Sequence, residues 1–268
     1  MRIIKMMKME MNSSMGVLFR KKRKVEAIDP KKRYSETLKV EALVLRRMHW
    51  SDYVCRIFMA GRLSPSMNVI VMTKMGPSLS SLRQQLHAIG FIHRDIKPSN
   101  FAIGLSGEER GKIHLLDFGF AHAYLRWTSQ GTLEHKPARP RAPFMGTDRY
   151  CSANVHNRNE QGRRDDMWSL FYTLIELMKG KLPWRSLHKT EILACKVRET
   201  PFLLDRCPWE LYKMYQHIRS LDYTSRPDYA LMRKVIDDVC ERRGFRLDDP
   251  LDWQEGGRLC KNNPKLLQ

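Results

Sequence analysis

Four side chains in two short segments could together act on a phosphate group. Asp95, Lys97 and Asn100 lie in the segment HRDIKPSN, and Asp117 opens the segment DFG. A carboxylate such as Asp95 can accept the proton of an attacking hydroxyl, and Lys97 can place a cation against the phosphate. The oxygens of Asn100 and Asp117 are hard ligands of the kind that Mg²⁺ prefers. The set predicts phosphoryl transfer from a magnesium-bound triphosphate.

The two segments gain specificity because they occur together. Alone, H-R-D could be a surface turn and D-F-G an ordinary loop. In this order, with the strand-like run Ile113–Leu116 leading directly into Asp117, the combination is specific. Asp166 starts an apolar helical segment and could accept backbone N–H bonds from His93 and Arg94. Alternatively, its charge simply favours the N-terminus of that helix.

The first third of the chain predicts a small sheet and one helix. Two β-like runs, Val54–Ala60 and Asn68–Thr73, flank a Gly-Arg-Leu-Ser-Pro-Ser turn and predict a hairpin. Before them, Ser35–Met48 has a helical pattern, and Glu41 lies on its apolar stripe. A buried acid needs a partner for its charge, so we expect a lysine beside Glu41.

Beyond Gly76 the pattern becomes helical. Asp165–Met178 is apolar almost all round, which predicts a buried central helix ended by Gly180. Amphipathic helices are expected at 190–197, 209–221 and 228–242. The pattern predicts an α+β fold of two lobes, a small, β-rich first lobe and a larger, mainly α-helical second lobe.

Composition limits the class of protein. The chain has 268 residues with 48 Lys and Arg against 29 Asp and Glu, so its surface should attract phosphate, nucleic acid or acidic segments, or is simply solvated. The six cysteines form no C-x-x-C pair, which favours a reducing compartment.

No apolar run approaches the length of a membrane span, so we expect an intracellular protein. The basic run Arg20–Lys24 could direct nuclear import or be ordinary solvated charge, which leaves a cytoplasmic or nuclear location open.

Several longer segments resemble one family. FIHRDIKPSNF, GTDRYCSANVH and RRDDMWSLFYTLIELMKGKLPW are similar to the casein kinase I superfamily of protein kinases. DMWSLFY, LDYTSRPDY and DPLDW resemble its tau-tubulin kinase-like branch. The resemblance covers roughly residues 24 to 253. It implies a monomeric serine/threonine kinase that uses ATP and Mg²⁺ on protein substrates, often near acidic or already phosphorylated positions. The alternative is a catalytically impaired pseudokinase or binding module; a nucleic-acid binder or membrane protein is not expected.

The resemblance also implies roles for individual residues. Asp95 would be the catalytic base, Lys97 would stabilise the phosphate, and Asn100 and Asp117 would hold the metal. Thr147 in GTDRY would hydrogen-bond near Asp95 and Lys97, or would be a plain turn threonine. Two arginines of the same region, Arg141 and Arg149, could form a cationic substrate subsite or be solvated.

For the nucleotide, the resemblance implies a lysine, a glutamate and a hinge. Lys24 in KVEA would be the ATP lysine and would pair with Glu41, although neighbouring basic residues leave the identity of this lysine open. Met72 would guard the adenine pocket, or would simply end a strand. Thr73 to Met75 would offer backbone bonds to the base.

Two departures from the family stand out. A glycine-rich loop should precede the ATP lysine, yet the only glycine before Lys24 is Gly16. The stretch from Gly76 to His93 has room for one helix of about three turns, ending near Gly90, where the family has two helices. We therefore divide the chain into a basic N-terminal extension (1–23), a truncated N-lobe with the hinge (24–75), a C-lobe (76–253) and a C-terminal tail (254–268).

Overall fold

The computed structural model describes residues 15–19, 40–48, 57–64, 67–73, 85–103 and 113–245. Its strands and helices follow from the apolar patterns of the sequence, and each is introduced below with its bounds. Within these residues, no helix is both long and apolar enough to cross a membrane.

A three-stranded antiparallel sheet lies in the first part of the chain. Strands β2 (Ile57–Ser64) and β3 (Met67–Thr73) form the expected hairpin. The expected turn was placed too early, because β2 continues through the predicted Gly-Arg-Leu-Ser segment and Gly61 pairs with Val69. The ladder absorbs this length through two register shifts within β2.

The outer strand β1 (Met15–Phe19) pairs with β3, which gives the order β1-β3-β2. This strand lies within residues 1–23, which the sequence predicted to be a basic extension. The apolar run MGVLF extends the sheet by one strand, with Met15 opposite Thr73. The division of the chain at residue 23 stays a prediction.

A helix over residues 40–47 confirms the described part of the helix expected from Ser35. Its Val44 and Leu45, and Met48 in the turn that follows, are buried in a cluster with Leu86 and Phe118. The helix thus contacts the DFG segment. A second short helix, over 85–88, is followed by a turn that ends at Gly90 with a φ of 84°. This end is as expected for the single helix predicted before the segment HRDIKPSN (93–100), which is called the catalytic loop below.

Three two-stranded ribbons carry the segments between the sheet and the main helices. The pairs are all antiparallel: β4 (Phe91–Ile92) with β7 (His122–Ala123), β5 (Phe101–Ile103) with β6 (Ile113–Leu115), and β8 (Leu125–Trp127) with β9 (Leu133–His135). Short 3₁₀ turns follow Lys97 (η1, Pro98–Asn100) and Asp117 (η3, Phe118–Phe120).

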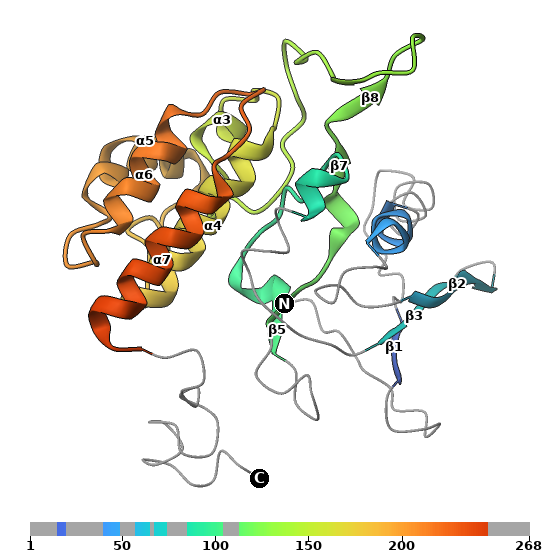
Figure 1. Ribbon diagram of the computed structural model, residues 1–268, viewed down its shortest axis with the longest axis horizontal. Helices are drawn as coiled ribbons and strands as arrows, with labels where there is room; N and C mark the ends of the chain where they lie inside the picture. Colours follow the sequence, from blue (N-terminus) through green and yellow to red (C-terminus); the bar gives the residue numbers. More distant parts are fainter. Residues whose placement is uncertain are drawn as a thin grey trace, which may run out of the picture.

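The helical part of the chain confirms the four expected helices within a few residues. They are α4 (Arg163–Lys179), α5 (Lys189–Glu199), α6 (Leu211–Ser220) and α7 (Tyr229–Arg243). The structure adds a short helix that was not predicted, α3 (Ala153–His156), and a 3₁₀ turn, η4 (Thr200–Phe202), after α5. Helix α4 supplies Met167, Phe171 and Ile175 to the main core, and Gly180 ends it in the left-handed conformation. Figure 1 shows α3–α7 gathered on one side and β1–β3 on the other.

Candidate active site

The β5–β6 ribbon brings Asn100 and Asp117 to the same place. Phe101 pairs with Leu115, and the N–H of Leu116 donates to the carbonyl of Asn100 at 2.7 Å, which extends the ladder by one step. Asn100 therefore precedes β5 at the end of the ribbon where Asp117 follows β6. Asp117 has a φ of 63°, a left-handed conformation that a non-glycine residue adopts only when its surroundings hold it there.

A dense set of hydrogen bonds surrounds Asp95, which is buried. Thr147 Oγ1 donates to Asp95 Oδ1 at 2.6 Å, and Lys97 Nζ donates to Asp95 Oδ2 at 2.6 Å and to Thr147 Oγ1 at 3.0 Å. The side-chain amide of Asn100 donates to the backbone carbonyl of Asp95 at 2.8 Å. The structure thus brings together Asp95, Lys97, Thr147 and Asn100, and it fixes the orientation of the Asp95 carboxylate.

Asp166, at the start of α4, holds the backbone of the catalytic loop. Its carboxylate accepts from the N–H of His93 at 2.7 Å, from the N–H of Arg94 at 2.8 Å and from His87 Nε2 at 2.9 Å. The anchoring role is confirmed, rather than a mere preference for the helix N-terminus. Burial alone would raise the pKa of Asp166, but the bond from His87 and the neighbouring donors outweigh it and lower the pKa.

His93 connects the catalytic loop with the DFG segment. Its Nε2 lies 3.2 Å from the carbonyl of Leu116, and its Nδ1 accepts from the N–H of Asp95 at 3.3 Å. Burial lowers the pKa of His93, although the charges of Asp166, Asp95 and Asp117 act in the opposite direction. The ring is therefore neutral at pH 7, with its proton on Nε2.

The phenyl ring of Phe118 fixes the residue before it. The ring is buried, meets His93 edge-on at 5.1 Å between centroids, and packs against Val44 and Leu45 of the helix over 40–47. This burial explains how Asp117 is held in its left-handed conformation. On the other side of the turn, Arg94 Nε donates to the carbonyl of Phe120 at 2.6 Å.

The loop that carries Thr147 touches the catalytic loop through a glycine. Gly146 has a φ of 115°, and a Cβ atom at this position would lie 2.5 Å from the carbonyl oxygen of Arg94. Only glycine allows this approach of the two backbones. The sequence analysis missed this requirement, since one glycine before a threonine gives no sign of what lies opposite.

A buried lysine, which the sequence analysis also missed, supports the same loop. Lys196 on α5 is 1% exposed, and its Nζ donates to the carbonyl of Asp148 at 2.6 Å and to that of Cys151. The ammonium lies over the rings of Tyr172 and Trp184, 5.3 and 5.5 Å from their centroids. Burial lowers its pKa to about 8. Its position one helical turn after the buried Ile192 was the available signal.

The residues predicted for the nucleotide are described only in part. Lys24 and Met75 lie outside the described residues, so the predicted pair between Lys24 and Glu41 stays a prediction. Glu41 is 5% exposed, as expected for an acid on the inner face of its helix. Met72 lies in β3, where it pairs with Gly16 on one side and with Ile57 on the other.

The two arginines of the predicted cationic subsite, Arg149 and Arg141, differ in their surroundings. Arg149 lies 3.8 Å from a carboxylate oxygen of Glu176 and donates weakly to the carbonyl of Arg185 at 3.5 Å. Arg141 is exposed.

The two residues predicted to bind a metal, Asn100 and Asp117, have the chemistry that magnesium requires. Because the amide nitrogen of Asn100 is used by the Asp95 carbonyl, its oxygen is left as the ligand atom, and Asp117 adds a carboxylate at the same end of the ribbon. Mg²⁺ is commonly held by one or two such oxygens together with waters and substrate phosphates.

Comparison with known proteins agrees with this arrangement. A family model described as "Protein kinase domain" matches residues 79–244, which is more than half of the chain. The chain belongs to this family. It is 37% identical over 257 residues to a candidate serine/threonine-protein kinase of Dictyostelium discoideum, covering 86% of this chain and 50% of that protein. It is 32% identical over 243 residues to another from Caenorhabditis elegans, covering 81% and 69%. The chain thus spans about half the length of the first relative.

Proposed function

We propose that the chain is a serine/threonine protein kinase, which transfers the γ-phosphoryl group of ATP to a hydroxyl of a protein substrate. The observation that carries this proposal is the network in which Asp95, Lys97 and Thr147 are mutually hydrogen-bonded beside Asn100. Such a network orients a base and a cation before the substrate arrives, and this pre-organisation is most of what phosphoryl transfer requires.

The chemistry assigns a role to each of these residues. Asp95 accepts the proton of the substrate hydroxyl as its oxygen bonds to the γ-phosphorus, and the bond from phosphorus to the β,γ-bridging oxygen breaks so that ADP leaves with that electron pair. Lys97 stabilises the negative charge on the transferred group. Asn100 and Asp117 would hold Mg²⁺, which neutralises phosphate charge when bound. Thr147 positions Asp95.

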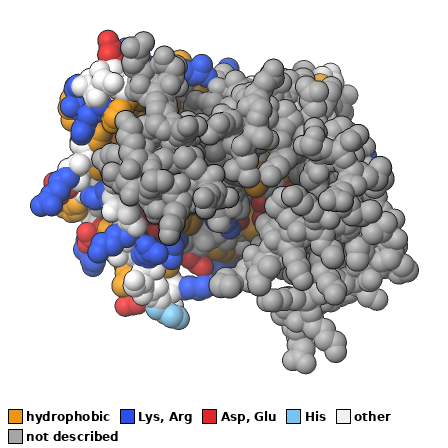
Figure 2. Space-filling model, turned by 90° about the horizontal axis from the view of Figure 1, so that it is seen from below, with side chains coloured by type: hydrophobic (Ala, Val, Ile, Leu, Met, Phe, Trp, Pro, Cys, Tyr) orange, Lys and Arg blue, Asp and Glu red, His pale blue; other side chains and the backbone are white. Residues whose placement is uncertain are grey.

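The finer family assignment is also part of the proposal. The GTDRY segment and the helix that starts RRDD support a member of the casein kinase I superfamily, of the tau-tubulin kinase-like branch, with a small β-rich N-lobe and a helical C-lobe. Lys and Arg side chains gather on the described part of one face (Figure 2), which supports acidic or already phosphorylated substrates. We propose a monomer that acts in the cytoplasm or nucleus.

The test is transfer of labelled phosphate to casein by the purified chain with ATP and Mg²⁺. We expect incorporation that Asp95→Asn reduces by at least about 10²-fold, as for loss of a general base. Equal incorporation by the wild-type chain and the variant would reject the proposal. A wild-type chain that binds nucleotide but transfers nothing would instead favour the pseudokinase.

A further inference from the structure

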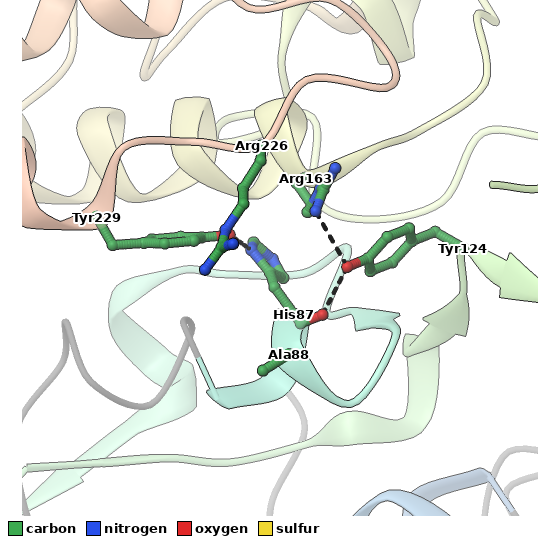
Figure 3. Close-up of a pocket in the computed structure, with 6 residues that line it drawn as sticks. All are labelled: His87, Ala88, Tyr124, Arg163, Arg226 and Tyr229. Carbon is green, nitrogen blue, oxygen red and sulfur yellow. Dashed lines mark hydrogen bonds between the residues drawn. The ribbon is translucent and has the colours of Figure 1, made fainter. Parts of the chain in front are cut away.

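A cavity of about 340 Å³ lies behind the catalytic loop, where the helix over 85–88 meets the starts of α4 and α7. Figure 3 shows two arginines and two tyrosines around it. The described residues that line it are His87, Ala88, Tyr124, Arg163, Arg226 and Tyr229. None of the residues assigned above to base, phosphate or metal lines this cavity, so it is a separate site.

Arg163 contributes a positive charge that has no carboxylate partner among the described residues. Its guanidinium lies over the ring of Tyr124, 4.8 Å from the centroid, and donates to the Tyr124 hydroxyl at 3.3 Å and to the carbonyl of Thr224 at 2.6 Å. Its Nε is buried and has no hydrogen-bond partner. These neutral acceptors hold the guanidinium in place and leave its charge uncompensated.

Arg226 supplies the second positive charge. Its side chain reaches over the cavity toward His87 and Tyr229 (Figure 3). Within the described part of the chain, no hydrogen bond or ion pair engages its guanidinium. Arg226 and Arg163 both line the cavity together with Tyr124.

No acid among the described lining residues balances these cations. Asp166, which bonds to His87 of the lining, already accepts hydrogen bonds from His87, His93 and Arg94. Two guanidinium groups in a concave, partly apolar space raise the local concentration of anions, and guanidinium matches the geometry of phosphate oxygens.

We propose that this cavity binds a phosphate group, held between Arg163 and Arg226. The aromatic rings of Tyr124 and Tyr229 form the walls on which the carbon part of a phosphate monoester would pack. The group could belong to a free phosphorylated compound or to a phosphorylated side chain of a peptide, and these sources are separated below by experiment.

The cavity is connected to the catalytic loop by His87. The Nδ1 of His87 lies 2.6 Å from the Tyr229 hydroxyl, its backbone carbonyl accepts from the Tyr124 hydroxyl at 2.6 Å, and its Nε2 bonds to Asp166. A ligand that contacts these tyrosines restrains the same His87 that shares Asp166 with the catalytic loop. This regulatory consequence rests on the proposed kinase function, whereas phosphate binding itself does not.

The test measures thermal unfolding of the full chain against increasing inorganic phosphate, phenyl phosphate or a phosphoserine peptide, with chloride at matched ionic strength. For the wild-type chain we expect phosphate compounds to raise the midpoint by about 2 to 4 °C at saturation, because a ligand that binds only the folded state stabilises it. Arg226→Gln should weaken the dependence on phosphate at least fivefold, and Arg226→Lys less so. Arg206→Gln, at a side chain that is 92% exposed, is the charge-matched control and should behave as wild type.

The possible results of this experiment distinguish the phosphate site from its alternatives. Equal phosphate dependence in Arg226→Gln and wild type, or an equal loss in Arg206→Gln, would overturn the proposal, as would no stabilisation beyond that of chloride. Tighter binding of the phosphoserine peptide than of the two small compounds identifies a phosphorylated segment as the ligand, and the reverse identifies a free compound. Binding of ADP with Mg²⁺ should persist in Arg226→Gln; a chain that binds phosphate here but transfers none to casein would refute the kinase function alone.

Discussion

Two buried charges of opposite sign hold the two loops that meet at the active site. Asp166 accepts bonds from the backbone N–H groups of the catalytic loop, whereas Lys196 donates to backbone carbonyls of the loop that carries Thr147. Both are 1% exposed. The loops meet where Thr147 donates to Asp95. Each buried charge thus provides hydrogen-bond partners for the backbone N–H or carbonyl groups of one loop, which buried polar groups require.

The two anchors differ in what compensates their charge. Asp166 has His87 and two N–H donors, so its pKa lies below its usual range despite burial and it stays charged at neutral pH. Lys196 has carbonyls, aromatic rings and a histidine nitrogen around it, and its pKa falls to about 8. The catalytic loop therefore has a permanent anchor, while the anchor of the neighbouring loop loses its charge within reach of mildly alkaline pH.

The largest expected effect comes from Asp166→Asn. The amide keeps one acceptor oxygen and turns an NH₂ group toward the remaining donors, so one of the backbone N–H groups of His93 and Arg94 loses its acceptor. We expect the free energy of unfolding to fall by about 3 kcal/mol and phosphoryl transfer to become undetectable. Chemical denaturation and the casein assay check this. Asp237→Asn, on the exposed side of α7, should change neither quantity.

Gly146→Ala tests the junction between the loops. Since the added methyl would lie 2.5 Å from the carbonyl of Arg94, the loop must move and Thr147 must leave Asp95. We expect kcat to fall on the order of 10²-fold with the ATP affinity unchanged, because a small displacement of positioning groups is costly. Gly131→Ala, in an open turn where the new methyl would meet nothing within 4 Å, controls for the strain of a positive φ. Similar kcat values for both variants would contradict the close contact.

The catalytic half of this site could be predicted from sequence, but its supports could not. Asp95, Lys97 and Asn100 are close along the chain, so their spacing already places them together. Asp166 was foreseen because its helix was recognisable. The contact of Gly146 with Arg94, and that of Lys196 with Asp148, join segments about fifty residues apart, and no local pattern encodes which segments meet.

In the fold, too, local features could be predicted from the sequence and long-range contacts could not. Helices α4 to α7 were placed within a few residues because their apolar stripes and end residues are local signals. The pairing of β1 with β3 was missed because nothing in the run MGVLF specifies a partner strand fifty residues away.

Lys196→Met probes the second anchor. Methionine keeps much of the packing against Tyr172 and Trp184 but leaves two carbonyls without a donor. We expect a rise of about tenfold in KM for the protein substrate, with little change in KM for ATP, if about 1.4 kcal/mol of positioning is lost. Lys189→Met is the matched control, because this 77% exposed lysine reaches Asp148 from solvent and should contribute little.

The pH dependence of stability should distinguish the surroundings of Lys196 from those of Asp166. Burial lowers the pKa of His156, a neighbour of Lys196, to about 4, so the unfolded chain binds a proton that the folded chain does not between pH 6.5 and about 4. Stability is therefore lost as pH falls through that window. Asp166, with its lowered pKa, contributes stability that is lost only below about pH 4.

Thermal unfolding from pH 7 to pH 3, compared with that of His156→Gln, measures this smallest effect. The variant should show a shallower decline of the midpoint above about pH 4 and the same decline below it. An unchanged slope above pH 4 would show that His156 is not responsible.

The pairing of β1 with β3 matters for anyone who produces a shortened version of this protein. Expression from residue 24, which omits the predicted basic N-terminal extension (1–23), would remove β1 and leave one side of β3 unpaired. An uncovered strand of seven mostly apolar residues, MNVIVMT, is a template for intermolecular pairing. Poor solubility of such a fragment would reflect a lost neighbour in the sheet rather than an unstable catalytic half.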